Sequence, residues 1–310
     1  MTELLQQLIN GLALGAIYAL IALGYTMVYG VLRFINFAHS DIFMVGAFSG
    51  YYLARFVPEA SIPAGVAVLL GSMTICALLG VIIEKLAYRP LRGRSTLTVL
   101  ITAIGVSLFL QNVGLLNKVF GNRPVTMSAL LPNEILATIG GVQLRLFDTL
   151  TIVLTVILVV FLERVVYGTK MGRAMRAVSF DERTASLMGI NVNSVVTVTF
   201  ALGSSLAAAG GILFALRNDL RQTADASWVL LGLKAFVSAV VGGIGNVRGA
   251  AAGAMLIAFV EVFIHRYVIK AFPDTAWVGQ LQDIYVFGIL ILVLLFKPSG
   301  LFGSAAVEKV

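Results

Sequence analysis

The sequence predicts an all-α polytopic membrane protein of about 8–10 transmembrane helices, and two features lead to that prediction. The first is composition, because the 310 residues are 59% hydrophobic and only 12% charged, with a mean hydropathy of +0.97. Soluble domains average about 25% charged residues. A soluble globule of this size keeps a large wet surface, which this composition could not cover. The second feature is a series of long apolar segments.

Four of these segments contain no Asp, Glu, Lys or Arg, and each is long enough for a bilayer span of about 20 residues. They are 4–32, 60–83, 95–117 and 184–216. Shorter apolar segments reach a spanning length if a flanking charged side chain extends to the interface. These shorter segments are 42–54, 149–162, 235–247, 249–260 and 284–296. The sequence therefore predicts nine crossings in one transmembrane domain that covers residues 1–310.

The distribution of positive charge predicts the orientation of these spans. No Lys or Arg precedes Arg33, which favours an N-terminus outside and Arg33 inside. Nine crossings from that start place the C-terminus in the cytoplasm, together with the basic loops 85–94 and 163–192. The formal net charge of +7 is thus explained by membrane orientation, and we expect no nucleic-acid partner.

Small residues recur at four-residue spacing in three segments, which allows close helix packing where lipid offers no hydrophobic drive. The three series are Gly11, Gly15 and Ala19; Gly203, Ala207 and Gly211; and Gly245, Gly249 and Gly253. The last series allows a second interpretation, because 242–249 could also form a broken or re-entrant element. Irregular backbone is tolerated at membrane depth only where protein or water surrounds it. On that interpretation Gly245 and Asn246 are candidate pathway or gate residues.

Lys234 and Glu261 are the ionisable residues most clearly inside apolar segments. A lone charge is costly there, so such residues usually pair or face a cavity. The opposite signs favour a structural ion pair between consecutive spans. A role in the solute pathway and a position of Lys234 near the outer interface are the alternatives.

A polar cluster lies between the first two predicted spans and contains Asn36, His39, Ser40 and Asp41. Asn, Ser and Asp side chains commonly accept hydrogen bonds from the free N–H groups at a helix start. Helix capping is therefore the structural interpretation. The functional interpretation is that this break lines or gates a conduit, and the two are compatible.

Catalysis is not favoured by the sequence. Histidine occurs only at His39 and His265, and the sequence contains no HExxH, CxxC, GxSxG or GxxxxGK[ST] motif. We expect no bound metal or cofactor. A transporter whose energy source lies in another subunit fits this inventory better.

The segment 172–190, GRAMRAVSFDERTASLMGI, is unusually polar for this chain. Ser179 and Glu182 match an S-x-x-E capping box for a helix over 179–189, and Gly189 could end that helix. Its mostly apolar face would carry Phe180, Leu187 and Met188. A helix this short is marginal in water, so it must dock. It either lies on lipid or fits a cleft in a cytoplasmic partner.

Four segments of the sequence resemble segments of a known family. The segment GRAMRAVSFDERTASLMGINV resembles the coupling loop of ABC importer permeases of the branched-chain amino-acid (LivH-type) group. INFAHSDIFMVGAF, GLKAFVSAVVGGIGNVRGAAAGAMLIAFVE and KPSGLFG resemble three further segments of that group, in the same order. Two positions depart from the usual pattern, because Ser40 stands where Gly is usual and Arg248 where Pro is common.

The resemblance implies a type II-like ABC importer permease fold in a bacterial inner membrane. It implies four partners: a second, homologous permease in a heterodimer, two ABC ATPase subunits that bind the ATP, and an external or periplasmic solute-binding protein. It also implies that the loop at about 164–192 couples to an ATPase. The residues expected to form that ATPase-coupling helix are Arg173, Arg176, Ser179, Phe180, Asp181, Glu182, Arg183, Leu187, Met188 and Gly189.

The expected function is therefore the permease subunit of an importer for branched-chain or other neutral amino acids. Urea or a short amide is the close alternative, since related permeases share these motifs. A self-sufficient channel or secondary transporter is the alternative from another class, and it would need no docking helix.

Overall fold

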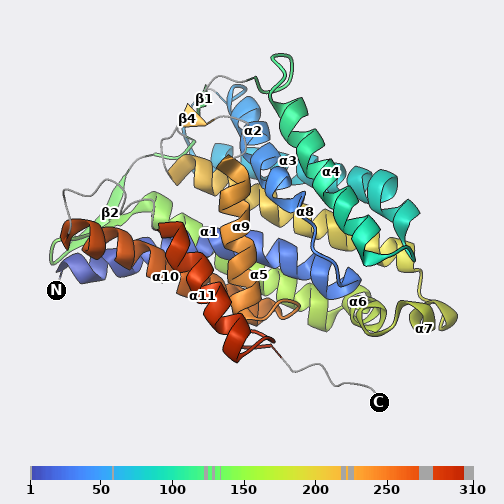
Figure 1. Ribbon diagram of the computed structural model, residues 1–310. Coiled ribbons are helices and arrows are strands. Elements are labelled where there is room, and N and C mark those ends of the chain that lie inside the picture. The colour runs from blue at the N-terminus through green and yellow to red at the C-terminus, as the bar shows by residue number, and fades with distance from the viewer. Residues whose placement is uncertain are drawn as a thin grey trace.

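The computed structural model describes residues 2–57, 59–121, 125–127, 130–132, 134–217, 221–222, 227–271 and 282–303. Helices dominate the described chain, which confirms the predicted all-α class (Figure 1). The α-helices are α1 (Thr2–Leu32), α2 (His39–Ala54), α3 (Ile62–Ile83), α4 (Thr96–Gly114), α5 (Leu146–Glu163), α6 (Lys170–Phe180), α7 (Glu182–Leu187), α8 (Val192–Arg217), α9 (Ser227–Gly242), α10 (Val247–Ala271) and α11 (Gln282–Phe296). Short π- or 3₁₀-helical turns follow α3 and α5, namely η1 (Glu84–Tyr88), η2 (Arg89–Leu91) and η3 (Arg164–Gly168).

Within the described residues, six helical segments are long and apolar enough to cross a membrane. They are Thr2–Leu32, Ile62–Leu91, Thr96–Gly114, Leu146–Gly168, Val192–Arg217 and Val247–Tyr267. The other three predicted crossings coincide with the shorter helices α2, α9 and α11. All nine predicted segments are thus helical, and six of them meet the length and composition of a full span.

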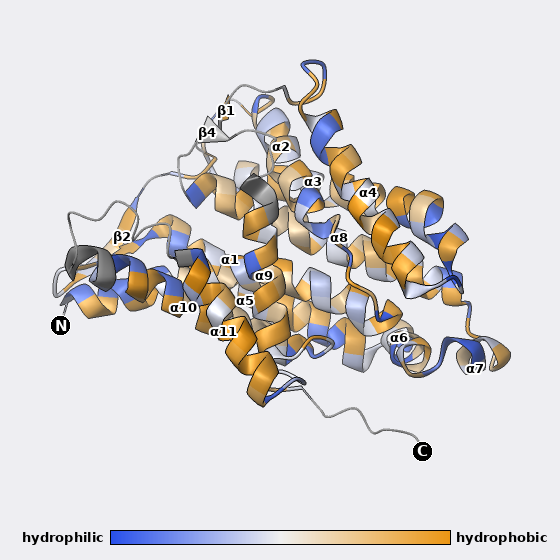
Figure 2. Cartoon of the chain, in the orientation of Figure 1, coloured by the Kyte–Doolittle hydropathy of each residue, from blue (hydrophilic) through white to orange (hydrophobic). Residues whose placement is uncertain are grey.

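Helix α1 lies at the centre of the bundle and contacts α10, α8, α5 and α9 (Figure 1). The apolar part of α1 is 94% buried, compared with 17% for α4 and 22% for α5. Figure 2 shows α4 and α11 as strongly hydrophobic along much of their length. A helix that exposes so much apolar surface needs lipid or another protein around it.

The predicted small-residue series lie where helices cross closely. A Cβ atom added at Gly15 would lie 3.0 Å from Cα of Met255 on α10. One added at Gly203 would lie 3.1 Å from the carbonyl oxygen of Gly24 on α1. Larger side chains at these positions would separate α1 from its neighbours, so the packing interpretation of the first two series is confirmed, while Gly245 of the third lies in a turn.

The Gly-rich segment forms a sharp turn between α9 and α10. Gly243 and Gly245 have φ angles of +109° and +94°, which residues with a Cβ rarely adopt. The amides of Leu301 and Phe302 donate hydrogen bonds to the carbonyl oxygens of Val241 (2.8 Å) and Gly242 (3.0 Å). The end of the described chain therefore packs on this turn and caps α9.

Four short strands lie at the opposite end of the molecule from α6 and α7 (Figure 1). Strands β2 (Ile135–Ile139) and β3 (Val142–Arg145) form an antiparallel hairpin. Strands β1 (Val125–Thr126) and β4 (Arg221–Gln222) also pair antiparallel. These strands were not among the elements predicted from the sequence.

At each end of the bundle, contacts join segments that the predicted topology puts on the same side of the membrane. At one end, Arg92 Nη1 donates to Asn193 Oδ1 at 2.7 Å, which joins the basic loop 85–94 to the first turn of α8, next to the basic loop 163–192. At the other end, Gln143 N donates to Gln6 Oε1 at 2.9 Å. Arg266 Nε also donates there to Glu3 Oε1, at 2.7 Å. Segments predicted to share a side of the membrane therefore lie together, while inside and outside remain predictions.

Candidate functional site

The predicted coupling helix consists of two helices, and this corrects the capping assignment. Helix α6 runs through Ser179 to Phe180, and α7 begins at Glu182. Asp181 lies between them with φ −157° and ψ 109°, and its carboxylate accepts the Arg183 N–H at 3.0 Å. Ser179 is inside α6, so it does not cap the next helix. Asp181 is the N-cap because its extended backbone aims its carboxylate at the first free N–H groups.

The predicted end of the coupling segment is confirmed. Gly189 follows α7 with a φ angle of +82°, the left-handed conformation common after a helix. The Gly189 and Ile190 amides donate to the carbonyl oxygens of Ser186 (3.0 Å) and Ala185 (3.1 Å). These bonds satisfy carbonyl groups that a six-residue helix otherwise leaves open.

The apolar residues predicted to dock are at the protein surface. Phe180, Leu187 and Met188 are 70%, 82% and 78% exposed, respectively. Helix α6 is held to the bundle by its other face, on which Met175 and Val178 are buried. Phe180, Leu187 and Met188 therefore form an apolar knob on the surface, at the end of the molecule that carries α6 and α7 (Figure 1).

The charged residues of the knob differ in their contacts. Arg173, Glu182 and Arg183 are exposed. Arg176 donates a hydrogen bond to the Val166 carbonyl oxygen and lies over the Tyr167 ring, with Cζ 5.5 Å from the ring centroid. Arg176 therefore fastens α6 to η3.

A cavity of about 90 Å³ connects the coupling segment with the helix bundle. Its lining includes Arg176 and Ser179 from α6, Gly30 from α1 and Gly245 from the Gly-rich turn. A residue predicted to gate the pathway thus lies beside residues predicted to couple to a partner. A displacement of α6 would therefore act on its near neighbours α1 and the turn between α9 and α10.

The structure reveals a buried charge cluster next to this region that the sequence analysis did not identify. The Glu84 carboxylate is fully buried and accepts hydrogen bonds from Arg89, Arg92 and Thr197. The Arg89 Nη2 and Thr197 Oγ1 distances to Glu84 Oε2 are 3.1 and 2.9 Å. Burial lowers the pKa of the Arg92 guanidinium, and attraction by Glu84 opposes that shift. The sequence signal that could have indicated this cluster is the position of Glu84, a single acid directly before the basic loop 85–94.

The capping interpretation of the cluster at residues 36–41 is wrong. Helix α2 begins after Ala38, and no side chain caps it. The buried Ser40 hydroxyl lies 2.7 Å from Tyr25 Oη, and Asn36 Oδ1 accepts a hydrogen bond from Tyr88 at 2.6 Å. These side chains face α1 and η1 because burial leaves them only neighbouring helices as partners.

His39 and Asp41 are buried in the same region. The His39 ring packs edge-on against Tyr25, with centroids 4.4 Å apart. Among the described residues, neither His39 Nε2 nor the Asp41 carboxylate has a hydrogen-bond partner. A role of this cluster in a conduit stays a prediction.

Asn246 has a structural position at the start of α10. Its Oδ1 accepts the Arg248 and Gly249 amides at 3.1 and 3.3 Å, and its Nδ2 donates to the Phe302 carbonyl oxygen at 2.9 Å. Asn246 therefore caps α10 and holds the C-terminal segment. The structure does not bring it together with the cluster around His39.

Lys234 and Glu261 lie next to each other, with 3.2 Å between Lys234 Nζ and Glu261 Oε1. Two further residues, which the sequence analysis did not include, complete the cluster. Asp283 Oδ1 lies 2.8 Å from Lys234 Nζ, and the Tyr18 hydroxyl donates to Glu261 Oε2 at 2.8 Å. The cluster therefore ties together α1, α9, α10 and α11. Within the described residues, no group of three or more His, Cys, Asp or Glu could hold a metal ion.

Comparison with known proteins shows the family. Residues 7–295 match the family described as branched-chain amino acid transport system / permease component. The chain belongs to this permease family. The high-affinity branched-chain amino acid transport system permease protein BraD of Pseudomonas aeruginosa is 38% identical over 99% of this chain and 98% of its own. The corresponding permease protein LivH of Escherichia coli is 35% identical over 99% of this chain and 97% of its own.

A relative with a different name also matches. The probable branched-chain amino acid transport permease protein LivM of Methanocaldococcus jannaschii is 30% identical over 54% of this chain and 50% of its own. The family is thus a multi-pass membrane permease family, and the LivH-type resemblance of the motifs is confirmed. All the candidate residues of this permease lie inside the matched range of 7–295.

Proposed function

We propose that this permease is the non-catalytic membrane subunit of an ATP-driven importer of branched-chain amino acids in a bacterial inner membrane. The observation that carries the proposal is similarity over 99% of the chain to BraD and LivH, whose names state transport of branched-chain amino acids. The relatives cover the α6–α7 knob and both ends of the bundle, so the similarity is not confined to generic membrane helices.

The knob formed by Phe180, Leu187 and Met188 is the proposed contact with an ABC ATPase. These side chains are highly exposed at one end of the molecule, where an apolar surface needs a partner. Arg173, Glu182 and Arg183 surround the knob and would orient it. The ATPase would bind the ATP, and its closure would move α6 against α1 and the Gly-rich turn.

A second, homologous permease is the proposed membrane partner, since both LivH and LivM relatives match this chain. The exposed apolar faces of α4, α5 and α11 offer surface for that partner and for lipid. A solute-binding protein would dock at the opposite end from α6 and α7. This arrangement places the N-terminus outside and the C-terminus in the cytoplasm.

Co-purification and reconstituted uptake test this proposal. The chain is expressed with the gene products beside its own gene, and the purified assembly is placed in vesicles with ATP inside and the binding protein and labelled L-leucine outside. We expect two ATPases per assembly and uptake that stops without ATP. Urea uptake in place of leucine uptake would favour the alternative substrate, and uptake by the chain alone would contradict the importer.

The double change Glu182→Ala and Leu187→Asp tests the ATPase contact. We expect the ATPases to be lost from the purified assembly while membrane insertion is unchanged. Ser186→Asp is the matched control, because Ser186 is an exposed polar residue of the same helix. Unchanged ATPase recovery and stimulation with the double variant would show that the knob is not the contact.

A further inference from the structure

A large polar cavity lies at the end of the bundle opposite α6 and α7. It has a volume of about 470 Å³, within the range of about 300–1,000 Å³ typical of small-molecule sites. The polar residues of its lining are Gln6 and Asn10 from α1, Gln143 and Arg145 from β3, Asp148 from the first turn of α5 and Arg217 from the end of α8.

Arg217 has unused hydrogen-bonding capacity. Its Nη2 donates to the Asn10 carbonyl oxygen at 3.3 Å, while its Nη1 is buried and has no hydrogen-bond partner among the described residues. A guanidinium carries five N–H donors in a planar fork that matches a carboxylate. A partly buried arginine with an unfilled donor that lines a cavity is a candidate ligand-binding residue.

Asp148 supplies the opposite charge in the same cavity. It is 8% exposed, and within the described chain its carboxylate is attracted to Arg217 and Arg145 without a direct hydrogen bond or ion pair to either. Two opposite charges that share a cavity without pairing leave room for a molecule between them. A zwitterion carries the matching charges, a carboxylate for Arg217 and an ammonium for Asp148.

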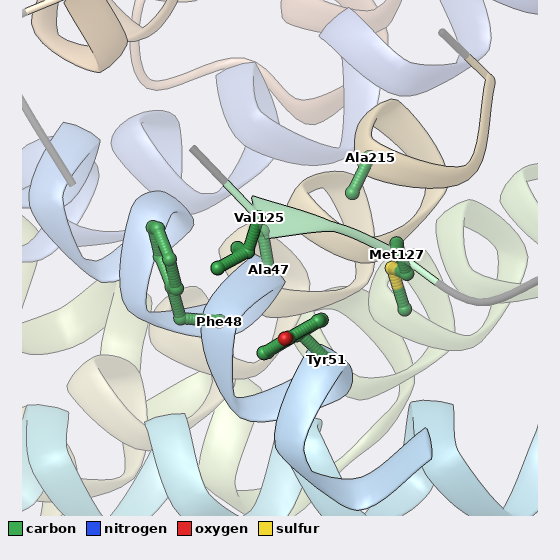
Figure 3. Close-up of a pocket in the computed structure, with 6 residues that line it drawn as sticks. All are labelled: Ala47, Phe48, Tyr51, Val125, Met127 and Ala215. Atoms are coloured by element: carbon green, nitrogen blue, oxygen red, sulfur yellow. The ribbon is translucent and has the colours of Figure 1, made fainter. Parts of the chain in front are cut away.

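One part of the cavity lining is apolar and suits an aliphatic side chain. It includes Leu130, Leu131, Phe147 and Leu216. A small neighbouring cavity of about 10 Å³ shares Met127 and Ala215 with this wall (Figure 3). Figure 3 shows Phe48 and Tyr51 of α2 on its other side. This neighbouring cavity is too small for a solute, so the residues around it serve only to line the wall of the large cavity.

A second cavity continues from the first toward the centre of the bundle. It has a volume of about 380 Å³, and Asn10 and Arg217 line both. Tyr18, Leu231 and Glu261 line its inner part. Arg217 therefore lies at the junction between the open end of the bundle and the charge cluster around Lys234.

We propose that Arg217 and Asp148 form a solute subsite that receives a zwitterionic aliphatic amino acid as it enters the permease. Arg217 binds the α-carboxylate, Asp148 binds the α-ammonium, and the apolar wall contacts the side chain. The proposal rests on the proposed function for its substrate class. It adds the two residues that would distinguish a zwitterion from urea or a neutral amide.

Ligand-observed NMR tests the subsite directly. The chain is purified in lipid nanodiscs with the subunits that co-purify and without the binding protein, and L-leucine is added as the probe. We expect saturation transfer to the leucine methyl protons. Leucinol lacks the carboxylate and 4-methylpentanoate lacks the ammonium, so we expect at least tenfold weaker binding of each, because each loses a charge-assisted hydrogen bond.

Four variants locate the binding. Arg217→Gln and Asp148→Asn are expected to weaken leucine binding at least tenfold, while Arg217→Lys retains more affinity than Arg217→Gln. Arg55→Gln is the matched control, because Arg55 is exposed and contacts Tyr51 outside the cavity. Size-exclusion profiles and unfolding temperatures show whether each variant is folded, and the ratio of leucine to leucinol affinity does not depend on the folded fraction.

The outcomes separate the subsite from the proposed function. If vesicles with the complete assembly import leucine but the nanodisc sample binds leucine and leucinol equally, the subsite is wrong and the function stands. Binding of leucine to Arg217→Gln at wild-type affinity would likewise overturn the subsite alone. If the complete assembly imports no amino acid, the function fails and the subsite fails with it.

Discussion

The ammonium group of Lys234 lies 2.8 Å from the carboxylate of Asp283, which belongs to a different helix and is 49 positions further along the chain. Glu261 lies 3.2 Å from the same ammonium group. Lys234 and Glu261 are both more than 90% buried, whereas the Asp283 side chain is 41% exposed. The lysine thus joins a buried acid to one that water or headgroups can reach.

Replacing this lysine with a neutral side chain should destabilise the permease strongly. Lys234→Met removes the cation that both carboxylates contact, and loss of one partner of a buried ion pair costs roughly 3–5 kcal/mol. Thermal unfolding in detergent measures the change, with the exposed Lys118→Met as the control. Adding Glu261→Gln to Lys234→Met should cost less than the two single changes together. Strict additivity would show that the two residues do not interact.

The buried Glu84 should stabilise the end of the bundle that carries the basic loops. Glu84→Gln leaves Arg89 and Arg92 without their shared carboxylate, and we expect a loss of about 1–3 kcal/mol. Unfolding temperatures and hydrogen exchange over η1 and η2 report the effect. Glu134→Gln, at an exposed position on the opposite end, should change neither measurement. Equal stability of both variants would contradict the structural role of Glu84.

The two candidate caps of the coupling segment make opposite predictions. Asp181→Ala removes the carboxylate that accepts the Arg183 amide, and loss of an N-cap costs about 1 kcal/mol. Amide exchange over 182–188 should accelerate accordingly, about fivefold. Ser179→Ala should leave that exchange unchanged, because Ser179 lies inside α6. Faster exchange in Ser179→Ala than in Asp181→Ala would restore the capping box that the sequence suggested.

The turn between α9 and α10 should accept no side chain at Gly243. A Cβ there would lie 2.5 Å from the Gly303 amide nitrogen, and the φ angle of +109° adds strain. Gly243→Ala should therefore cost more than about 1–3 kcal/mol. Gly288→Ala is the control, since a Cβ at Gly288 meets nothing within 4 Å. Alanine there should stabilise α11 by about 0.5–1 kcal/mol, and a neutral Gly243→Ala would contradict the close packing.

Charge-free runs located the helices well, because a bilayer span must be apolar over a fixed length. All nine predicted segments are helical, and the knob residues Leu187 and Met188 are exposed as predicted. Helix ends were harder to predict. Ser179 and Asp181 are both good cap residues, and only the backbone conformation of each decides which one caps.

Partners from distant helices could not be predicted from local pattern. Tyr18 looked like one more large side chain in an apolar run, yet it donates a hydrogen bond to Glu261, 243 positions away. Asp283 lies just before the predicted apolar segment 284–296, and nothing in the local sequence indicates that it contacts Lys234. Arg217 and Asp148 line the same cavity, and this likewise depends on how α5 and α8 are arranged in space.

The bonds from Leu301 and Phe302 to the end of α9 also have a consequence for the timing of folding. Helix α9 carries Lys234, and its last carbonyl groups gain their donors only from residues about 60 positions later. A ribosome that is still translating α10 and α11 therefore holds an α9 whose carboxyl end is open. Helix α9 can therefore reach its final hydrogen bonding only after residues 301 and 302 have been synthesised.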